Sequence, residues 1–393
     1  MEGVNVLTIN VGSSSLKCSL IETADERTQA SSHADWASLP TRYTFTSTES
    51  PTVHSEVGWS DVKPAIHRVA ADFRVNTNEE IAAVAHRVVH GGTRFTQPVL
   101  VTAEVEEALQ DLTPLAPLHN PSCLEGIAAA REVFPNLPHV AVFDTAFHST
   151  LAPEAYTYAI PQAWSVEWDL RRFGFHGLSH AYCSQRAAQI LDRPSIGLRV
   201  VIAHLGHGAS LAAIRDGKSI DTTMGFTPLE GLMMATRSGS VDPGLVLHLL
   251  QENRFTANQI DRALNRESGL IGVSGVSSDM RTVLQAAEAG NERAKLAIAI
   301  YVHRLRQAIG AMAATLGGFD ALIFTGGVGR HSAAIRAAAC SRLAFLGIQI
   351  DPIANASVTS DTDVSTTGTK ARVLVIETNE ELMLARESAR VVN

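Results

Sequence analysis

The stretch TINVGSSSLKCSL, residues 8–20, predicts a strand, a short polar turn and a second strand. From Leu16 to Leu20 apolar and polar side chains alternate, which is the period of a half-buried strand. The turn does not have the spacing of a P-loop, and a strand follows it instead of a helix. Its amides and hydroxyls can still bind phosphate oxygens. Two interpretations therefore remain, a phosphate-binding hairpin or an ordinary turn beside an exposed Lys17.

A second hairpin of the same kind occurs in the other half of the chain. AHLGHGASLAAI, residues 203–214, aligns with INVGSSSLKCSL, residues 9–20, and places Gly206 on Gly12. The apolar segments AVFD, residues 141–144, and LIFT, from residue 322, also align. Since the order of predicted elements repeats, we expect two duplicated α/β halves that face each other across a ligand-binding cleft.

Hydrophobic periodicity places the remaining elements. Helical patterns occupy the segments 103–112, 122–134, 179–191, 257–267, 291–317 and 378–392, and strands are predicted in 81–89, 139–144 and 320–325. Thr378 and Glu381 fit a capping box at the start of the last helix. Residues 24–78 are polar and weakly patterned, and we expect short strands and loops there.

Composition excludes several classes of protein. The formal net charge of -8 argues against a nucleic-acid partner. The 4 cysteines are far apart and form no CxxC pair, which argues against a disulfide scaffold or a zinc ribbon. No apolar run approaches the roughly 20 residues of a membrane span, and the N-terminus has no signal-peptide pattern. A cytoplasmic protein without a membrane partner is the expectation.

Several polar residues stand where ligands commonly bind. His176 precedes a predicted helix, where the free amides favour an anion, although a hydrogen-bonded core histidine is an equal alternative. His180 lies four residues further on, but no third ligand is apparent for a metal. Arg87, within an apolar strand, needs an anionic partner, either a structural carboxylate or a substrate. Asp144 closes another apolar strand and either faces a ligand or forms a local turn.

Three further segments are ambiguous by themselves. Arg237 lies in a loop rich in glycine and serine, and taken alone it is better interpreted as a solvent-exposed loop arginine. The capping box leaves Glu380 available for another partner. The sequence FTGGVGRHSAAIRAA, from Phe324, predicts a strand, a glycine turn and a helix, where a nucleotide can approach the backbone.

Taken together and in this order, the segments resemble the acetate kinase family, acyl-phosphate-forming kinases of the superfamily that also holds sugar kinases, heat-shock chaperone ATPases and actin. The matching segments are NVGSSSLK, HRVVHGG, PLAPLHNP, VFDTAFH, RRFGFHGLSH, HLGHGAS, MGFTPLEGLMMATRSG, GVSSDMR, FTGGVG and TNEEL. They run from residue 10 to residue 382, and the block around FTPLEGLMMATRSG is specific to the family.

The resemblance implies a fold of two ribonuclease-H-like (actin-like ATPase) domains with a cleft between them, and a homodimer. The domains would be 1–150 plus 379–393, and 151–378. It implies Mg²⁺-dependent (or Mn²⁺-dependent) transfer of a phosphoryl group from ATP to acetate, giving ADP and acetyl phosphate.

The resemblance also assigns roles to individual residues. The implied metal ligands are Asn10 and Glu380. The catalytic set would be His119, Asp144, His176 and Arg237. Arg87 would hold the acetate carboxylate in an apolar acyl pocket lined by Val89, Leu118, Phe175 and Pro228. The nucleotide would contact Lys17, His204, Leu205, Gly206, His207, Gly208, Asp279, Met280, Arg281, Gly327, Val328, Gly329, Arg330 and His331.

The chain departs from the family's usual pattern at a few of these positions. His207 stands where the second phosphate turn normally has asparagine, and Arg330 and His331 replace the usual Glu-Asn of the nucleotide turn. Cys123 also replaces a commoner asparagine. These changes leave open another phosphoryl donor, such as a different nucleotide or pyrophosphate. Propionate as the acid, a hydroxyl kinase of the same superfamily and a non-catalytic ATP-gated binding module are further alternatives.

Val89 provides a test of the acyl pocket. Because a methylene in an apolar pocket is worth only about 1–3 kcal/mol, Val89→Ala should shift the preference from acetate toward propionate by roughly tenfold or more. The measurement is the ratio of kcat/KM for the two acids, and an unchanged ratio contradicts the assignment.

Overall fold

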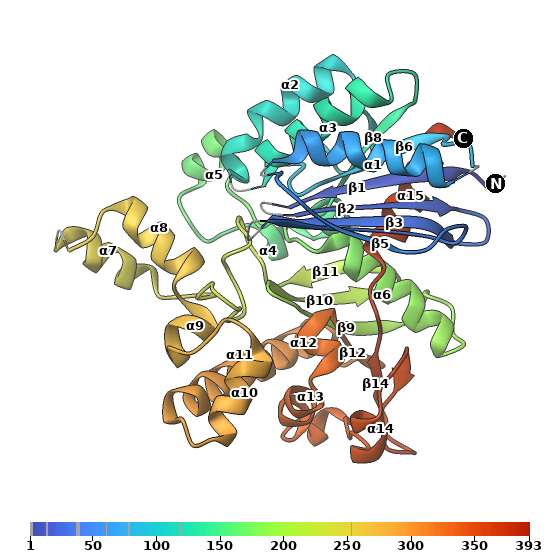
Figure 1. The fold of residues 1–393 in the computed structure, drawn as a ribbon. Helices are drawn as coiled ribbons and strands as arrows, with labels where there is room; N and C mark the ends of the chain where they lie inside the picture. Colours follow the sequence, from blue (N-terminus) through green and yellow to red (C-terminus); the bar gives the residue numbers. More distant parts are fainter. Residues whose placement is uncertain are drawn as a thin grey trace. The chain divides into compact units, whose positions relative to one another are not determined.

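The computed structural model describes residues 3–12, 15–36, 40–59, 61–77, 79–117, 119–252 and 254–393. The chain forms two compact units, each of which is described by itself (Figure 1). The first unit contains Met1–Phe147 and Asn379–Asn393, and the second contains His148–Thr378. Ser13 and Ser14 of the first predicted phosphate turn, and Leu118 of the predicted acyl pocket, lie outside the described residues.

The first unit is built on an eight-stranded sheet of order β5-β4-β3-β2-β1-β6-β8-β7. Strands β1, β6 and β8 are parallel, and the other neighbours are antiparallel. Its strands are β1 (Asn5–Val11), β2 (Ser15–Glu22), β3 (Arg27–Asp35), β4 (Thr41–Ser47), β5 (Val53–Val57), β6 (Ala83–Val88), β7 (Val99–Leu100) and β8 (His139–Phe143). Its helices are α1 (Val62–Asn76), α2 (Ala103–Asp111), α3 (Asn120–Val133) and α15 (Glu380–Val392).

Helices cover both faces of this sheet. Leu7, Ile9 and Val11 on β1 belong to the core that contains the buried residues of α1 and part of α3. Successive strand residues point to opposite faces, so Asn10 lies on the other face of β1. Helix α15 packs against β1, β6 and β8, and Figure 1 draws it on the side of the sheet away from α1 and α3. The alternation of β1 therefore directs Asn10 toward the helix that carries Glu380.

The second unit has a six-stranded sheet of order β11-β10-β9-β12-β14-β13. Its strands are β9 (Arg199–Leu205), β10 (Ala209–Arg215), β11 (Lys218–Thr222), β12 (Ala321–Thr325), β13 (Thr362–Asp363) and β14 (Arg372–Val375). Its helices are α4 (Pro153–Tyr156), α5 (Gln162–Trp168), α6 (Gly177–Ile190), α7 (Pro243–Gln251), α8 (Ala257–Arg266), α9 (Gly269–Ser274), α10 (Met280–Glu288), α11 (Glu292–Leu316), α12 (Gly326–His331), α13 (Ala333–Cys340) and α14 (Pro352–Ala356). Helix α11 packs on β10, and α6 packs on β9.

The two sheets repeat one topology. In β3-β2-β1-β6-β8 and in β11-β10-β9-β12-β14, an antiparallel meander is followed by two strands parallel to its first strand. Gly12 directly follows β1 and Gly206 directly follows β9, so the alignment of the two hairpins is confirmed. The alignment of AVFD with LIFT was wrong. LIFT belongs to β12, which pairs with β9 as β6 pairs with β1, so the counterpart of AVFD is β14.

Two other local predictions need correction. The segment 24–78 contains the predicted short strands, but it also contains the 15-residue helix α1. Its buried residues Val62, Ile66, Val69 and Phe73 follow helical spacing, which the polar surroundings obscured. The predicted capping box at Thr378 does not form, because the cap is Asn379, whose Oδ1 accepts from the Leu382 amide at 2.9 Å.

None of the helices in the described ranges has the length and apolar character needed to cross a lipid bilayer.

A buried histidine pair joins β6 to β8. His86 Nε2 and His139 Nδ1 are 2.9 Å apart, and His139 Nε2 is 3.0 Å from the Phe134 carbonyl oxygen. Because that carbonyl only accepts, His139 carries its proton on Nε2 and its Nδ1 accepts from His86. Burial lowers the pKa of both imidazoles.

This pair predicts a pH dependence of stability. In the unfolded chain each of these imidazoles binds a proton near pH 6.5, whereas in the folded pair both pKa values are lowered. The unfolded state therefore binds more protons, and the free energy of unfolding should fall as pH drops below about 6.5. His86→Gln should reduce that slope by up to about 1.4 kcal/mol per pH unit in denaturant titrations between pH 7 and pH 5. His54→Gln, at an exposed site in β5, is the control. Equal slopes for His86→Gln and the unaltered chain contradict the prediction.

Candidate active site

Arg87 is the centre of the polar cluster in the first unit. Its Nε and Nη2 donate to the two carboxylate oxygens of Asp144 at 2.9 and 2.5 Å. Its Nη1 donates to Asn10 Oδ1 at 3.1 Å and lies 3.9 Å from Glu380 Oε2. The Asp144 side chain is 2% exposed and that of Arg87 is 20% exposed. The anionic partner that the sequence predicted for Arg87 is therefore the carboxylate of Asp144. One edge of the guanidinium still faces solvent.

The sheet explains why these four residues meet. In the parallel pairing of β1, β6 and β8, Ile9 is opposite His86 and Arg87 is opposite Val142. Parallel strands end at the same edge of a sheet, so Asn10, Arg87 and Asp144 arrive there together. The cap at Asn379 begins α15 at Glu380, and this places the glutamate in the first helical turn beside them.

Each charge in the cluster depends on the others. Burial acts to lower the pKa of Arg87, but the carboxylates of Asp144 and Glu380 more than offset it, so the guanidinium stays charged. Burial raises the pKa of Glu380; Arg87 opposes this shift and Asp144 adds to it. A ligand anion that binds at this site therefore meets a cation that is already oriented by a bidentate ion pair.

The other predicted residues of this unit lie on β2, at the end of β6 and at the start of α3. Lys17 is exposed on β2, directly opposite Asn10 in the antiparallel register. Val89 follows β6, and the Cys123 thiol is hydrogen-bonded to its backbone. Burial raises the pKa of Cys123 to about 11, so it is an inert thiol. His119 is the N-cap residue of α3.

In the second unit His176 has an uncommon backbone conformation. It is the N-cap of α6 with φ 58° and ψ 27°, a left-handed geometry that non-glycine residues rarely adopt and that concentrates at functional sites. Its Nδ1 lies 2.9 Å from Ser210 Oγ, and that hydroxyl is 2.8 Å from His180 Nε2. The His176 ring stacks on His204 with centroids 4.3 Å apart. The prediction that His176 directly precedes a helix is confirmed.

These contacts involve Nδ1 and the ring face of His176, and its Nε2 points toward the glycine turn. A Cβ added at Gly208 would lie 3.3 Å from His176 Nε2 and 3.5 Å from Arg237 Nη1, so three predicted residues meet within this unit. The turn itself closes through a 2.9 Å bond from the Gly206 amide to the Gly208 carbonyl. Ser210 was not predicted, although its place at the end of the quoted HLGHGAS segment could have indicated it.

Arg237 differs from Arg87 in its partners. Its Nη1 donates to the Pro228 carbonyl at 3.2 Å, and among the described residues no carboxylate forms an ion pair with it. Burial without such a partner lowers its pKa. The pKa of His207 is lowered by burial and by the Arg237 charge, which favours a neutral imidazole in this turn. Phe175, the residue before His176, is buried.

The predicted nucleotide turn is a helix. Residues Gly326–His331 form α12, so the predicted glycine turn between the strand and the helix was wrong. Gly326 has φ +75°, and a Cβ there would lie 2.8 Å from the backbone of Leu205, which explains the glycine. Arg330 forms an ion pair with Glu377 and donates to the Thr359 carbonyl at 3.2 Å. The charge that departs from the family pattern is therefore neutralised within the unit.

The remaining predicted nucleotide residues are at the start of α10. Asp279 is its N-cap, and its carboxylate accepts from the Arg281 amide at 2.7 Å and from the Arg281 guanidinium at 2.7 Å. These bonds lower the pKa of Asp279 to about 2. Met280 is buried, so its side chain serves the core, while Arg281 is exposed.

The first unit contains the oxygen atoms best suited to a divalent cation. The described residues contain no group of three or more His, Cys, Asp or Glu placed to hold a metal. Asn10 Oδ1 and Glu380 Oε2 both lie against Arg87 Nη1. One or two protein oxygens fit Mg²⁺, which keeps several waters and binds substrate phosphates instead of a full protein cage.

Two such sheets, with an oriented arginine at one strand edge and a histidine-arginine-glycine cluster in the other unit, define an α/β phosphotransferase with a duplicated core. The acetokinase family matches residues 5–386. An acetate kinase from Synechococcus sp. (strain JA-2-3B'a(2-13)) is 49% identical, over 97% of this chain and 98% of the relative.

Solved structures give the same result. The crystal structure of Porphyromonas gingivalis acetate kinase has a TM-score of 0.91 and 39% identity, covering 99% of this chain and 100% of that one. A propionate kinase from Francisella tularensis subsp. tularensis SCHU S4 has a TM-score of 0.92 and 39% identity over the same shares. The chain belongs to the acetokinase family. It has the two-domain actin-like ATPase fold and is a kinase, a phosphotransferase whose acceptor is a carboxyl group.

Asp144→Asn tests the arginine cluster. Removing the charge while keeping the shape should lower kcat about 100-fold or more, because Arg87 loses its orienting partner. Asp72→Asn, which alters the Arg68 ion pair of α1 in the same unit, should leave kcat unchanged. Steady-state rates on folded protein are the measurement, and near-normal turnover of Asp144→Asn refutes the role.

Proposed function

We propose that this chain transfers the γ-phosphoryl group of ATP to acetate in a reversible, direct in-line reaction that gives ADP and acetyl phosphate. The observation that carries the proposal is the Arg87 guanidinium, which Asp144 orients beside the oxygens of Asn10 and Glu380. That arrangement can bind a carboxylate in a fixed orientation next to a site for a divalent cation.

The chemistry needs cations more than a base. Acetate is already ionised at pH 7, so the barrier lies in bringing two anions together. Phosphoryl transfer spreads charge over the equatorial oxygens, and preorganised cations stabilise that charge. Arg87 would hold the acetate, and His176 and Arg237 would stabilise the phosphoryl group. Asp144 would orient Arg87, since its carboxylate is fully used by that bidentate pair.

The other roles follow the family pattern. His119 would line the acyl site, and Val89, Leu118, Phe175 and Pro228 would bound the acid's methyl group. Lys17, the turn from His204 to Gly208, Asp279 to Arg281 and the segment from Gly327 to His331 would serve the nucleotide. Mg²⁺ (or Mn²⁺), held by Asn10 and Glu380, would neutralise the phosphates.

The assembly is also a proposal. We infer that the two units are the two domains of the family and that the chain forms a homodimer. Leu245 and Leu247 in α7 and Trp164 and Trp168 in α5 are exposed apolar side chains that a partner could cover. A cytoplasmic location remains a prediction of the sequence.

Two alternatives share the same site. The likeness to a propionate kinase at 39% identity supports propionate as a second acid. His207, Arg330 and His331 support testing another donor, but the pairing of Arg330 with Glu377 reduces the charge that ATP would meet.

Hydroxylamine trapping of acyl phosphate tests all of these readings together. Acetate, propionate and butyrate are each combined with ATP, GTP and pyrophosphate, with and without Mg²⁺. We expect the highest rate with acetate and ATP, and loss of product after chelation by EDTA. No product from any pair would leave the non-catalytic binding module as the better reading.

A further inference from the structure

The loop from residue 223 to residue 240, between β11 and α7, carries two residues of the proposed site, Pro228 and Arg237. It has no helix or strand and contains three glycines. Such a loop has high conformational entropy and needs outside contacts to hold one geometry. Those contacts come from a polar cluster that the proposed reaction does not use.

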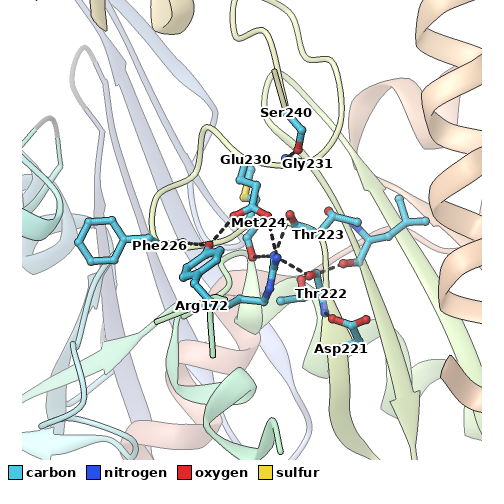
Figure 2. Close-up of polar contacts among 11 residues, drawn as sticks. Arg172, Asp221, Thr222, Thr223, Met224, Phe226, Glu230, Gly231 and Ser240 are labelled. Atoms are coloured by element: carbon cyan, nitrogen blue, oxygen red, sulfur yellow. Dashed lines mark hydrogen bonds and ion pairs between the residues drawn. The ribbon is translucent and has the colours of Figure 1, made fainter. Parts of the chain in front are cut away.

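Arg172 holds the start of the loop. Its Nη1 donates to three consecutive carbonyls, those of Thr222 at 3.0 Å, Thr223 at 3.1 Å and Met224 at 2.9 Å. Its Nη2 forms a 2.7 Å ion pair with Glu230 Oε1, further along the same loop (Figure 2). One guanidinium therefore fixes both the entry and the middle of the loop.

Tyr158 completes the cluster. Its hydroxyl donates to the other oxygen of Glu230 and accepts from the Phe226 amide at 2.8 Å. Burial, together with Glu230, raises the pKa of Tyr158, so the hydroxyl remains a donor. A Cβ at Gly225 would lie 1.7 Å from Glu230 Oε2 and 2.1 Å from the Tyr158 hydroxyl. The glycine is therefore required by the cluster.

The same contacts reach the histidine side of the site. The amides of Phe173 and Gly174, three and two residues before His176, donate to the Gly225 carbonyl at 3.1 and 3.3 Å. Arg172 precedes this pair directly. The segment that ends in the left-handed His176 and the loop that carries Arg237 are thus joined by one set of hydrogen bonds.

The far half of the loop closes on itself. Gly231 and Ser240 exchange two 3.0 Å hydrogen bonds, one through the Ser240 hydroxyl. The Arg237 carbonyl accepts from the Met234 amide at 3.1 Å, and its guanidinium donates to the Pro228 carbonyl. Arg237 is therefore fixed to the part of the loop that Glu230 and Arg172 hold.

We propose that Arg172, Glu230 and Tyr158 are positioning residues that set the place of Arg237 and Pro228 and the approach to His176. The inference rests on the proposed function, in which those three residues meet the phosphoryl group and the acid. None of the positioning residues needs to touch a substrate. Loss of one leaves buried carbonyls or a carboxylate unpaired, so the loop shifts by a fraction of an ångström while the sheet stays intact.

Three conservative variants test the inference on the full-length chain. Arg172→Lys keeps the charge but loses the fork, Glu230→Gln keeps the shape but loses the charge, and Tyr158→Phe removes only the hydroxyl. Arg372→Lys is the matched control. It alters an ion pair of the same kind with Asp363 between β13 and β14, away from the loop.

A positioning role predicts that the kinetic constants for acetate change while those for ATP stay nearly the same. For Arg172→Lys we expect kcat/KM for acetate to fall about 10- to 100-fold, with KM for ATP within about twofold. Tyr158→Phe should show the same pattern about threefold to tenfold, with thermal unfolding near that of the unaltered chain. Combined with Arg237→Lys, Tyr158→Phe should add little further loss, because both act through one group.

The outcomes separate the hypotheses. Normal acetate kinetics in all three variants, or equal losses in Arg372→Lys, overturn the positioning role while the proposed function stands. Fully additive losses in the double variant also overturn it. An unaltered chain that forms no acyl phosphate overturns the proposed function and this inference with it.

Discussion

A partly buried arginine, Arg87, at the edge of a parallel sheet is the constraint on which the first unit depends. A guanidinium taken out of water is costly unless it is paired, and Asp144 pairs it through both oxygens. This bond requires that β6 and β8 end together and that Asn10 on β1 reaches the same point. The start of α15 is subject to the same requirement, because Glu380 contributes the second carboxylate. The strand register that packs the sheet therefore also places the charged residues of the cluster next to one another.

In the second unit, neutral groups instead of carboxylates hold the candidate site residues in place. His176 is held by the Ser210 hydroxyl and by stacking on His204, and Arg237 by the Pro228 carbonyl. Arg237 thus has charge to offer an incoming anion, because no described carboxylate neutralises it. The loop that carries Arg237 contains three glycines and has high conformational entropy, so contacts from other segments must hold it in one geometry. Arg172 does this with a single nitrogen shared by three carbonyls.

Departures from the family pattern look different in their three-dimensional setting. In the sequence, Arg330 is a reversed charge in the segment predicted to contact the nucleotide, but it forms an ion pair with Glu377, 47 residues later in the chain. Burial and the Arg237 charge lower the pKa of His207, which favours its neutral form. Neither residue therefore adds an unpaired positive charge to the segments that the family pattern assigns to the nucleotide.

The sequence by itself determined the two hairpins, the duplicated order of elements, the helix that follows His176 and the motifs that identify the family. These are local patterns, since alternation, glycine turns and helical periods depend on near neighbours. It failed at α1, whose apolar stripe is diluted by polar residues, at the cap of α15, which moved by one residue, and at the pairing of AVFD with LIFT. Only the tertiary structure decided that Asp144 is the partner of Arg87, that Ser210 holds His176, and that Arg172 and Tyr158 hold the Arg237 loop. Those contacts join residues that are distant in the chain, and their geometry follows from strand order and register, which no local pattern encodes.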